Sequence, residues 1–301
     1  MAERKPNPKK QARAREAQLR TEQMSARFGK EIERSLAGVR RIEAPVEVEV
    51  EGRVPEVRVM AADAVAAILE HGRGRAEYCD LAVLDFASFT SPGGGYIRGA
   101  WAQEESLCAE SFLYNVLERQ GDWYGDNRRR NINCDLYRCR ALVVPKVRFA
   151  REKIHAYADV LVVAAPNARR AREEYKVKED ALLRAMRDRI RFALDLVDML
   201  GHKQVVLGAW GCGVFGWDAE LVAELFREEL AAGDHGIELA IFAVPRDRFN
   251  DNLAHFEHAL ATFPKKNPQS FSEALAERRA AEEAAAATEE DDEEDDWHNY
   301  L

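Results

Sequence analysis

Apolar positions along this chain form two kinds of pattern, short continuous runs and longer runs with helical spacing, which alternate through most of the sequence. Leu81–Phe86 and Gln204–Ala209 are short and almost wholly apolar, which is typical of strands buried on both faces. Residues 9–38 instead place an apolar side chain at every fourth position from Met24 to Leu36, which predicts an amphipathic helix. Further predicted strands are residues 46–50, 57–59, 141–149, 159–164 and 237–244, and further predicted helices are residues 61–71, 106–119, 173–200, 219–232, 246–263 and about 270–287.

Strands that alternate with helices in this way predict an α/β sandwich, with helices on both faces of a mixed β-sheet. We expect three layers (α/β/α) over residues 41–265, preceded by a basic helical extension at residues 1–40. A helix at residues 266–288 and an acidic C-terminal tail at residues 289–301 follow. The net charge is −9, yet residues 289–296 alone are eight consecutive carboxylates. A run of like charge cannot bury apolar surface, so we expect a disordered tail.

Two glycine-rich loops carry the candidate chemistry. Pro92–Gly95 follows the first buried strand and is soon followed by Gln103, Glu104 and Glu105, whereas residues 210–216 follow the second buried strand. In open α/β sheets the carboxyl ends of such strands are where ligands sit, and bare amides at a helix N-terminus bind anions. The two loops together predict an extended ligand with phosphates at its middle, beside carboxylates suited to acid/base chemistry.

The sequence around both loops resembles the microbial-type poly(ADP-ribose) glycohydrolases, whose catalytic domain is a macrodomain. Gly-Gly-Gly followed at short spacing by Gln-Glu-Glu is the family signature, and it lies here within the wider match of residues 84–88 and 102–108. Residues 207–216 resemble the second, diphosphate-binding loop, and residues 164–167 match a segment between the two. The similarity covers roughly residues 40–262, and both loops occur in the family's order. It implies a macrodomain-like fold.

The resemblance also implies a role for individual residues. Glu105 would act as general acid and then general base at the ribose–ribose bond, while Glu104 would hydrogen-bond ribose hydroxyls. Phe215 would pack against a sugar or base, and the second loop would take the diphosphate. The substrate-binding residues implied in this way are Asp85, Gly93, Gly94, Gly95, Gln103, Gly211, Cys212, Gly213, Val214, Phe215 and Gly216.

Elementary chemistry qualifies these roles at three points. Glu104 and Glu105 are adjacent, so their side chains diverge, and one carboxylate serving both steps is more plausible than the usual flanking pair. A helix N-terminus favours the charged form of a carboxylate, whereas a general acid needs a proton, so desolvation must oppose the helix dipole. Asp85 stands where the family has asparagine, and an ionised carboxylate accepts hydrogen bonds but does not donate them.

The cysteine content and the lack of long apolar segments indicate the cellular compartment in which we expect this protein. The five cysteines are scattered and form no close pair, which favours free thiols in a reducing, cytoplasmic compartment (or a nucleus, in a eukaryote). No segment has the length and apolarity of a membrane span, and the basic N-terminus lacks the apolar core of a secretory signal. We expect no cofactor, no metal site, no membrane contact and no direct nucleic-acid binding.

Two other functions remain open at this level. A macrodomain that binds ADP-ribose without cleaving it would need no positioned acid, and Asp85 keeps that possibility open. The third possibility is a hydrolase that removes single ADP-ribosyl groups. The expected partners are ADP-ribose or poly(ADP-ribose) and ADP-ribosylated proteins, whose modification this protein would reverse, for instance in the response to DNA damage.

Overall fold

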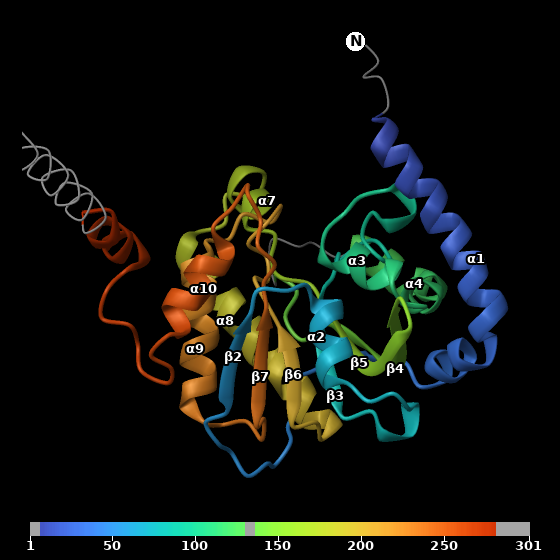
Figure 1. Ribbon diagram of the computed structural model, residues 1–301, viewed down its shortest axis with the longest axis horizontal. Helices are drawn as coiled ribbons and strands as arrows, with labels where there is room; N and C mark the ends of the chain where they lie inside the picture. The colour runs from blue at the N-terminus through green and yellow to red at the C-terminus, as the bar shows by residue number, and fades with distance from the viewer. Residues whose placement is uncertain (1–6, 130–135, 281–301) are drawn as a thin grey trace, which may run out of the picture.

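A seven-stranded mixed sheet forms the centre of the computed structural model, which describes residues 7–129 and 136–280 (Figure 1). The strand order across the sheet is β1-β4-β5-β3-β6-β7-β2. The antiparallel pairs are β1 with β4 and β4 with β5, and the remaining neighbours run parallel. The strands are β1 (Arg40–Ile42), β2 (Glu56–Met60), β3 (Leu81–Phe86), β4 (Ala141–Arg151), β5 (Ile154–Val163), β6 (Gln204–Leu207) and β7 (Leu239–Ala243).

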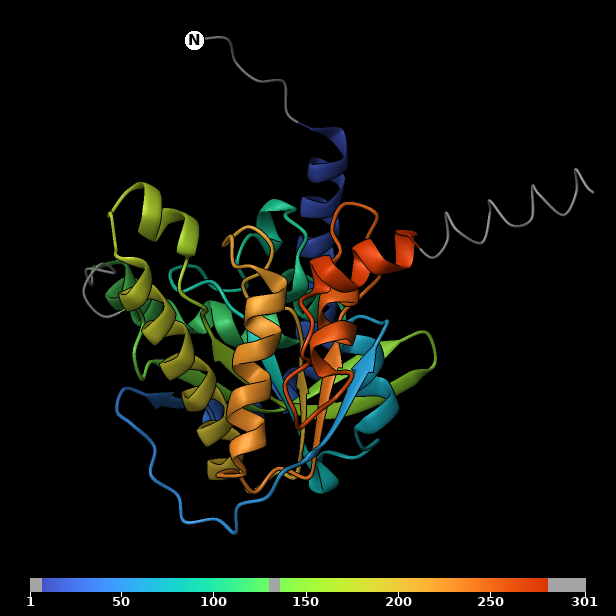
Figure 2. The same cartoon turned by 90° about the vertical axis from the view of Figure 1, so that its left-hand side faces the viewer.

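Helices cover both faces of this sheet, so the expected three-layer α/β/α architecture is confirmed (Figures 1 and 2). The face that carries the first glycine loop is covered by α1 (Pro8–Ala37), α2 (Ala64–His71), α3 (Gln103–Ala109), α4 (Leu113–Leu117) and α5 (Gly121–Arg129). The opposite face is covered by α8 (Glu179–Leu200), α9 (Ala219–Ala232) and α10 (Asn252–Leu260), and α8 and α9 lie side by side in Figure 2. The remaining short helices are η1 (Ala76–Tyr78), η2 (Tyr96–Arg98), η3 (Glu118–Gln120) and α7 (Ala168–Glu173).

The central strands β3, β5 and β6 are almost entirely buried, and for β3 and β6 the apolar runs predicted this. Because β3 lies between β5 and β6 and runs parallel to both, the carboxyl ends of all three strands meet at one edge of the sheet. Both glycine loops leave from that edge. The fold therefore places the two candidate loops beside each other.

Several expectations about local structure were wrong. The helix expected at residues 173–200 begins only at Glu179, and the helix expected at residues 246–263 spans only Asn252–Leu260. Residues 46–50 form no strand despite their alternating valines, and the short strand β1 was not foreseen. The helix expected at residues 106–119 is broken into α3 and α4 at Ser111. The Ser111 hydroxyl donates to the carbonyl of Leu107 (2.6 Å) and accepts from the amide of Leu113 (3.0 Å), so it replaces helical hydrogen bonds at the break.

Helix α1 packs directly against η2 and Gly99, which follow the first glycine loop. The Arg13 guanidinium donates from Nε to the carbonyl of Gly99 (3.1 Å), and the hydroxyl of Tyr96 contacts the carbonyl of Ala17 (3.4 Å). A side chain at Gly99, whose φ is 72°, would collide with the backbone of α1 at Lys10. The boundary expected at residue 40 stays a prediction, but α1 is in contact with the segment that follows the first glycine loop.

Helical structure continues at residues 271–280, within the helix expected at the C-terminal end. The acidic tail, residues 289–301, lies outside the described residues. Within the described part of the chain, no helix combines the length and the apolarity that crossing a membrane requires.

Candidate active site

A cavity of about 780 Å³ opens at the carboxyl-terminal edge of the sheet, beside the second glycine loop. Its walls come from the end of β3, the start of α3, the second glycine loop and the segment after β7. The sequence-predicted residues that line it are Gln103, Gly211, Gly213, Val214 and Phe215. The lining does not include the other predicted residues, Asp85, Gly93, Gly94, Gly95, Glu104, Glu105, Cys212 and Gly216. A volume of this size is in the range that holds a nucleotide-sized ligand.

Gln103 fixes the start of α3 to the end of β3. Its side-chain Oε1 accepts from the amide of Phe86 (2.9 Å), and its Nε2 donates to the carbonyl of Leu84 (2.9 Å). The pairing of β3 with β6 ends at Val83, so the amide group of Gln103 continues the hydrogen bonding of this strand. Gln103 therefore acts on the strand backbone, a positioning function that the sequence pattern did not reveal.

The two glutamates are held by backbone amides on either side of the first glycine loop. Glu104 Oε2 accepts from the amide of Ser88 (2.7 Å), and Glu105 Oε1 accepts from the amide of Gly95 (2.7 Å). A Cβ at Gly94, where φ is 60°, would lie 2.6 Å from Glu105 Oε1 and 2.8 Å from Glu104 Oε2. The bare loop thus accommodates the protein's own carboxylates, and glycine is required there because both carboxylates approach its backbone.

Asp85 completes a buried acidic cluster with Glu104 and Glu105. Asp85 has no exposed surface, and Glu105 retains 6%. Within the described residues, both carboxylate oxygens of Asp85, Oε1 of Glu104 and the hydroxyl of Tyr124 are buried without a hydrogen-bond partner. Unsatisfied buried polar groups are costly, and their concentration here indicates a site prepared to receive polar groups of a ligand.

Burial strongly raises the pKa of Asp85, and the charge of Glu105 adds to the effect. Burial also raises the pKa of Glu104, with a further increase from the charge of Asp85. Closely packed carboxylates in a desolvated site resist simultaneous ionisation. A neutral carboxyl has an O–H, so a protonated Asp85 would be able to donate a hydrogen bond, which an ionised carboxylate cannot do.

Replacing Asp85 by asparagine should reduce the loss of stability with rising pH. A carboxyl with a raised pKa stabilises the fold most at low pH, and this contribution falls as pH rises from about 4, the unfolded-state value, through the raised pKa. When the folded state binds one proton more than the unfolded state, the free energy of unfolding falls by about 1.4 kcal/mol per pH unit. Asparagine does not titrate, so Asp85→Asn should lack this contribution. The measurement is denaturant unfolding of both proteins between pH 4 and pH 8. Asp188→Asn, at an exposed position of α8, is the control and should parallel the wild type. If the unfolding free energy of Asp85→Asn changed with pH as that of the wild type does, the raised pKa of Asp85 would be contradicted.

The second glycine loop presents a row of backbone amides. Within the described residues, the amides of Gly213, Val214 and Phe215 donate to no other atom. Gly211 adopts a φ of 81°, and a Cβ there would lie 2.7 Å from the ring of Trp217. Successive free amides on a bare loop form an anion-binding concavity, so this loop is the one suited to a diphosphate.

Helix α5 supplies contacts that the sequence analysis missed. Asn127 donates to the carbonyl of Phe89 (2.9 Å), and Arg128 donates to the carbonyl of Thr90 (2.6 Å). The side chain of Tyr124, from the same helix, reaches the acidic cluster, whose charges raise its pKa in addition to burial. The basic run at residues 127–131 begins inside this helix, because its described part, residues 127–129, is helical.

The remaining candidate side chains, a histidine, an aspartate and two cysteines, have structural roles. Asp159 accepts a hydrogen bond from the backbone amide of Lys146 (2.7 Å) and contacts His202 (3.0 Å) and Cys79 (3.5 Å). Among the described residues, Asp159, His202 and Cys79 form the group whose side-chain atoms are spaced closely enough to hold a metal ion. Burial raises the pKa of the Cys79 thiol, which opposes a thiolate ligand. Burial likewise raises the pKa of the Cys212 thiol, which argues against a nucleophilic thiolate in the second loop.

Comparisons with known proteins agree with this geometry. The sequence model of the microbial-type poly(ADP-ribose) glycohydrolase catalytic domain matches residues 9–152. The crystal structure of poly(ADP-ribose) glycohydrolase from Thermomonospora curvata is similar with 27% identity and a TM-score of 0.69, over 82% of this chain and 98% of that one. The enzyme from Deinococcus radiodurans in complex with ADP-ribose is similar with 29% identity and a TM-score of 0.62, over 78% of this chain and 91% of that one. Among curated proteins, no sequence matches this chain.

Proposed function

This chain belongs to the microbial-type poly(ADP-ribose) glycohydrolases, and we propose that Glu105 is the residue with which it hydrolyses ribose–ribose O-glycosidic bonds. The product is free ADP-ribose. The observation that supports this role most strongly is the position of the Glu105 carboxylate. It is held on the amide of Gly95 (2.7 Å) beside the Asp85 and Glu104 carboxyls, on helix α3, whose residues Gln103 and Ser106 line the ligand cavity.

The reaction proceeds in two proton transfers on the same carboxyl group. Protonated Glu105 gives its proton to the 2′-oxygen of the neighbouring ADP-ribose unit while the bond from that oxygen to the anomeric carbon breaks. The oxocarbenium-like centre is stabilised by the substrate's own diphosphate, which we place on the free amides of Gly213, Val214 and Phe215. A water molecule then adds to the anomeric carbon, and its proton returns to Glu105, which restores the starting state.

The acidic cluster supports this use of a single carboxyl group. Most glycosidases place two carboxylates about 5 Å or more apart on either side of the scissile bond. The side chains of Glu104 and Glu105 do not diverge as expected but converge on one glycine, with oxygens 2.8 and 2.6 Å from the Cβ position of Gly94. Glu104 keeps one oxygen without a partner among the described residues, which suits a hydrogen bond to a ribose hydroxyl. The raised pKa values of Asp85 and Glu104 limit the negative charge that an anionic substrate meets.

A substrate panel tests the proposed function. Purified protein is incubated with poly(ADP-ribose) and, separately, with a protein that carries single ADP-ribosyl groups on serine or glutamate, and free ADP-ribose is quantified by chromatography. We expect release from the polymer at a rate at least tenfold above that from the single groups. Release from single groups alone would replace this proposal with the mono-ADP-ribosyl hydrolase.

We also propose that ADP-ribosylated proteins of a reducing intracellular compartment are the natural partners.

A further inference from the structure

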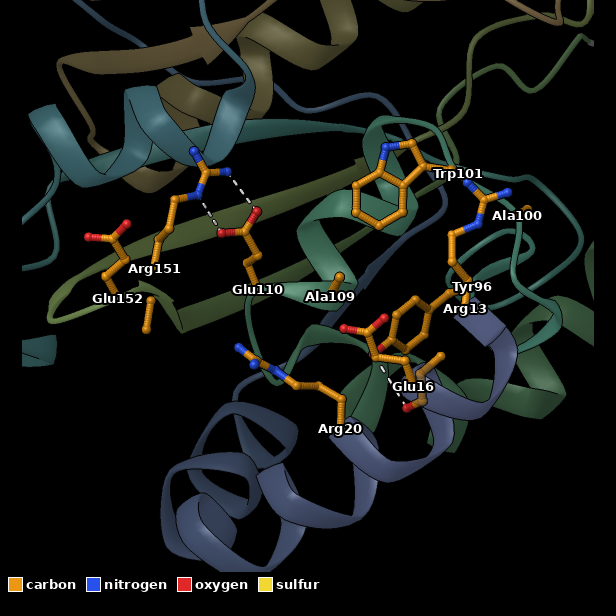
Figure 3. A pocket seen from close by; sticks show the side chains of 12 residues that line it. Arg13, Glu16, Arg20, Tyr96, Ala100, Trp101, Ala109, Glu110, Arg151 and Glu152 are labelled. Atoms are coloured by element: carbon orange, nitrogen blue, oxygen red, sulfur yellow. Dashed lines mark hydrogen bonds and ion pairs between the residues drawn. The ribbon is translucent and has the colours of Figure 1, made fainter. Parts of the chain in front are cut away.

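A second cavity, of about 500 Å³, lies between α1 and the loop segment at residues 96–101, which follows the first glycine loop (Figure 3). Arg13 and Arg20 line it from α1, and Tyr96, Ala100 and Trp101 line it from the loop. Part of its wall is shared with the ligand cavity described above, because both include Trp101, Glu110 and Arg151. The two cavities are therefore adjacent, with α3 beginning where they meet.

The second cavity lies close to the carboxylate of Glu105, which we propose cleaves the scissile bond. Ala100, on its wall, donates from its amide to the carbonyl of Gly95 (3.0 Å), and Gly95 is the residue whose own amide holds Glu105. The second glycine loop, which suits the diphosphate of the unit being released, belongs to the first cavity. A polymer bound across Glu105 would thus place its departing part on the side of α1.

Some charged side chains in this cavity form ion pairs with one another, and others do not. Glu110 binds Arg151 through both carboxylate oxygens (2.6 Å each), as Figure 3 shows. Within the described residues Arg13 and Arg20 form no ion pair, and the buried Nε of Arg20 has no hydrogen-bond partner. Figure 3 shows the Arg20 guanidinium pointing into the space between α1 and the Glu110–Arg151 pair.

Two features identify the chemistry of a matching ligand. Guanidinium groups recognise phosphate oxygens, and exposed aromatic rings stack on bases, and the Trp101 side chain is 59% exposed. Glu16 and Glu152 also line the cavity, so its net charge is low. Such a mixed lining favours a ligand with phosphates spaced apart by sugars and bases over a dense polyanion.

We propose that this cavity, here named the α1 cavity, is a subsite for the ADP-ribose unit on the leaving side of the scissile bond. This inference rests on the proposed hydrolysis of poly(ADP-ribose), because only a polymer has an ADP-ribose unit on the leaving side of the bond. Arg20 binds a phosphate of the leaving unit, and Trp101 stacks on its base. Longer ADP-ribose chains then bind more tightly than ADP-ribose itself.

The test measures binding by a protein that does not cut its ligand. In a Glu105→Gln background, affinities for ADP-ribose and for a defined ADP-ribose trimer are measured by calorimetry. We expect the trimer to bind about tenfold more tightly, the gain typical of one charge-assisted hydrogen bond. Adding Arg20→Ala should abolish that gain and leave the affinity for ADP-ribose unchanged, and Arg20→Glu should weaken trimer binding further.

Arg15→Ala is the matched control, because Arg15 lies on the same helix at an exposed position outside the cavity. Equal affinities for trimer and monomer would overturn the proposal, and so would an Arg20→Ala effect of equal size on both ligands. A single-stranded oligonucleotide that competes as well as the trimer would overturn the assignment to ADP-ribose. Failure of the proposed hydrolysis is distinguishable, since it appears as intact polymer with the wild-type protein while the trimer still binds more tightly.

Discussion

Glu105→Gln should leave a folded protein that binds ADP-ribose and no longer releases it from polymer at a measurable rate. Glutamine keeps the oxygen that accepts from the amide of Gly95, so the loop that surrounds the site should persist. What it loses is the exchangeable proton on which both steps of the reaction depend. General acid–base catalysis contributes roughly 10²- to 10⁴-fold to enzymatic rates, and both steps lose it here, so we expect a loss at the upper end of that range.

The measurement is the initial rate of ADP-ribose release from polymer, together with the affinity for ADP-ribose. Glu118→Gln, at an exposed position of η3, is the matched control and should retain the wild-type rate. If Glu105→Gln lost affinity and turnover in the same proportion, the residue would serve binding and not proton transfer. A rate within tenfold of wild type would mean that another group carries the proton.

The second large effect is expected for Gly94→Ala. Its φ of 60° costs an alanine about 1–2 kcal/mol, and the added Cβ would lie within 3 Å of an oxygen of both Glu104 and Glu105. The carboxylates must therefore move, and displacement of catalytic groups by about 1 Å costs roughly 100-fold in rate. We expect a rate loss of that order with a fall in thermal stability of a few degrees.

Gly121→Ala is the control for this variant, because a Cβ at Gly121 meets no atom within 4 Å and its φ is −59°. It should retain both the rate and the melting temperature. Polymer cleavage by Gly94→Ala at the wild-type rate would contradict the close approach of the loop to the two carboxylates.

The main elements of the fold could be predicted from the sequence where the local pattern and the tertiary structure agree. The strand Leu81–Phe86 and the helix Ala219–Ala232 have the bounds expected from apolar periodicity. The pattern fails at Ser111, where a side chain replaces helical hydrogen bonds. It fails again at residues 46–50, whose alternation has no neighbouring strand to pair with among the described residues.

The candidate site could be located from its motifs, but its internal geometry could not. Nothing in the order of residues indicates that Gln103 completes the hydrogen bonding of β3, or that Tyr124 joins the acidic cluster from α5. Such contacts join residues distant in sequence, and no periodicity encodes them. The basic charge of the N-terminal region was evident, whereas the contact of Arg13 with Gly99 emerged only from the packing of α1.

The central claim is that Glu105 catalyses hydrolysis in the cleft that binds ADP-ribose. One paired assay tests it most directly, in which wild-type and Glu105→Gln proteins are given the same polymer and free ADP-ribose is followed over time. ADP-ribose binding to each protein is measured in parallel. The account predicts accumulating ADP-ribose with the wild type, none above background with Glu105→Gln, and similar affinities for both. Polymer that stays intact with the wild type, despite measurable ADP-ribose binding, would contradict it and leave a protein that recognises ADP-ribose without cleaving it.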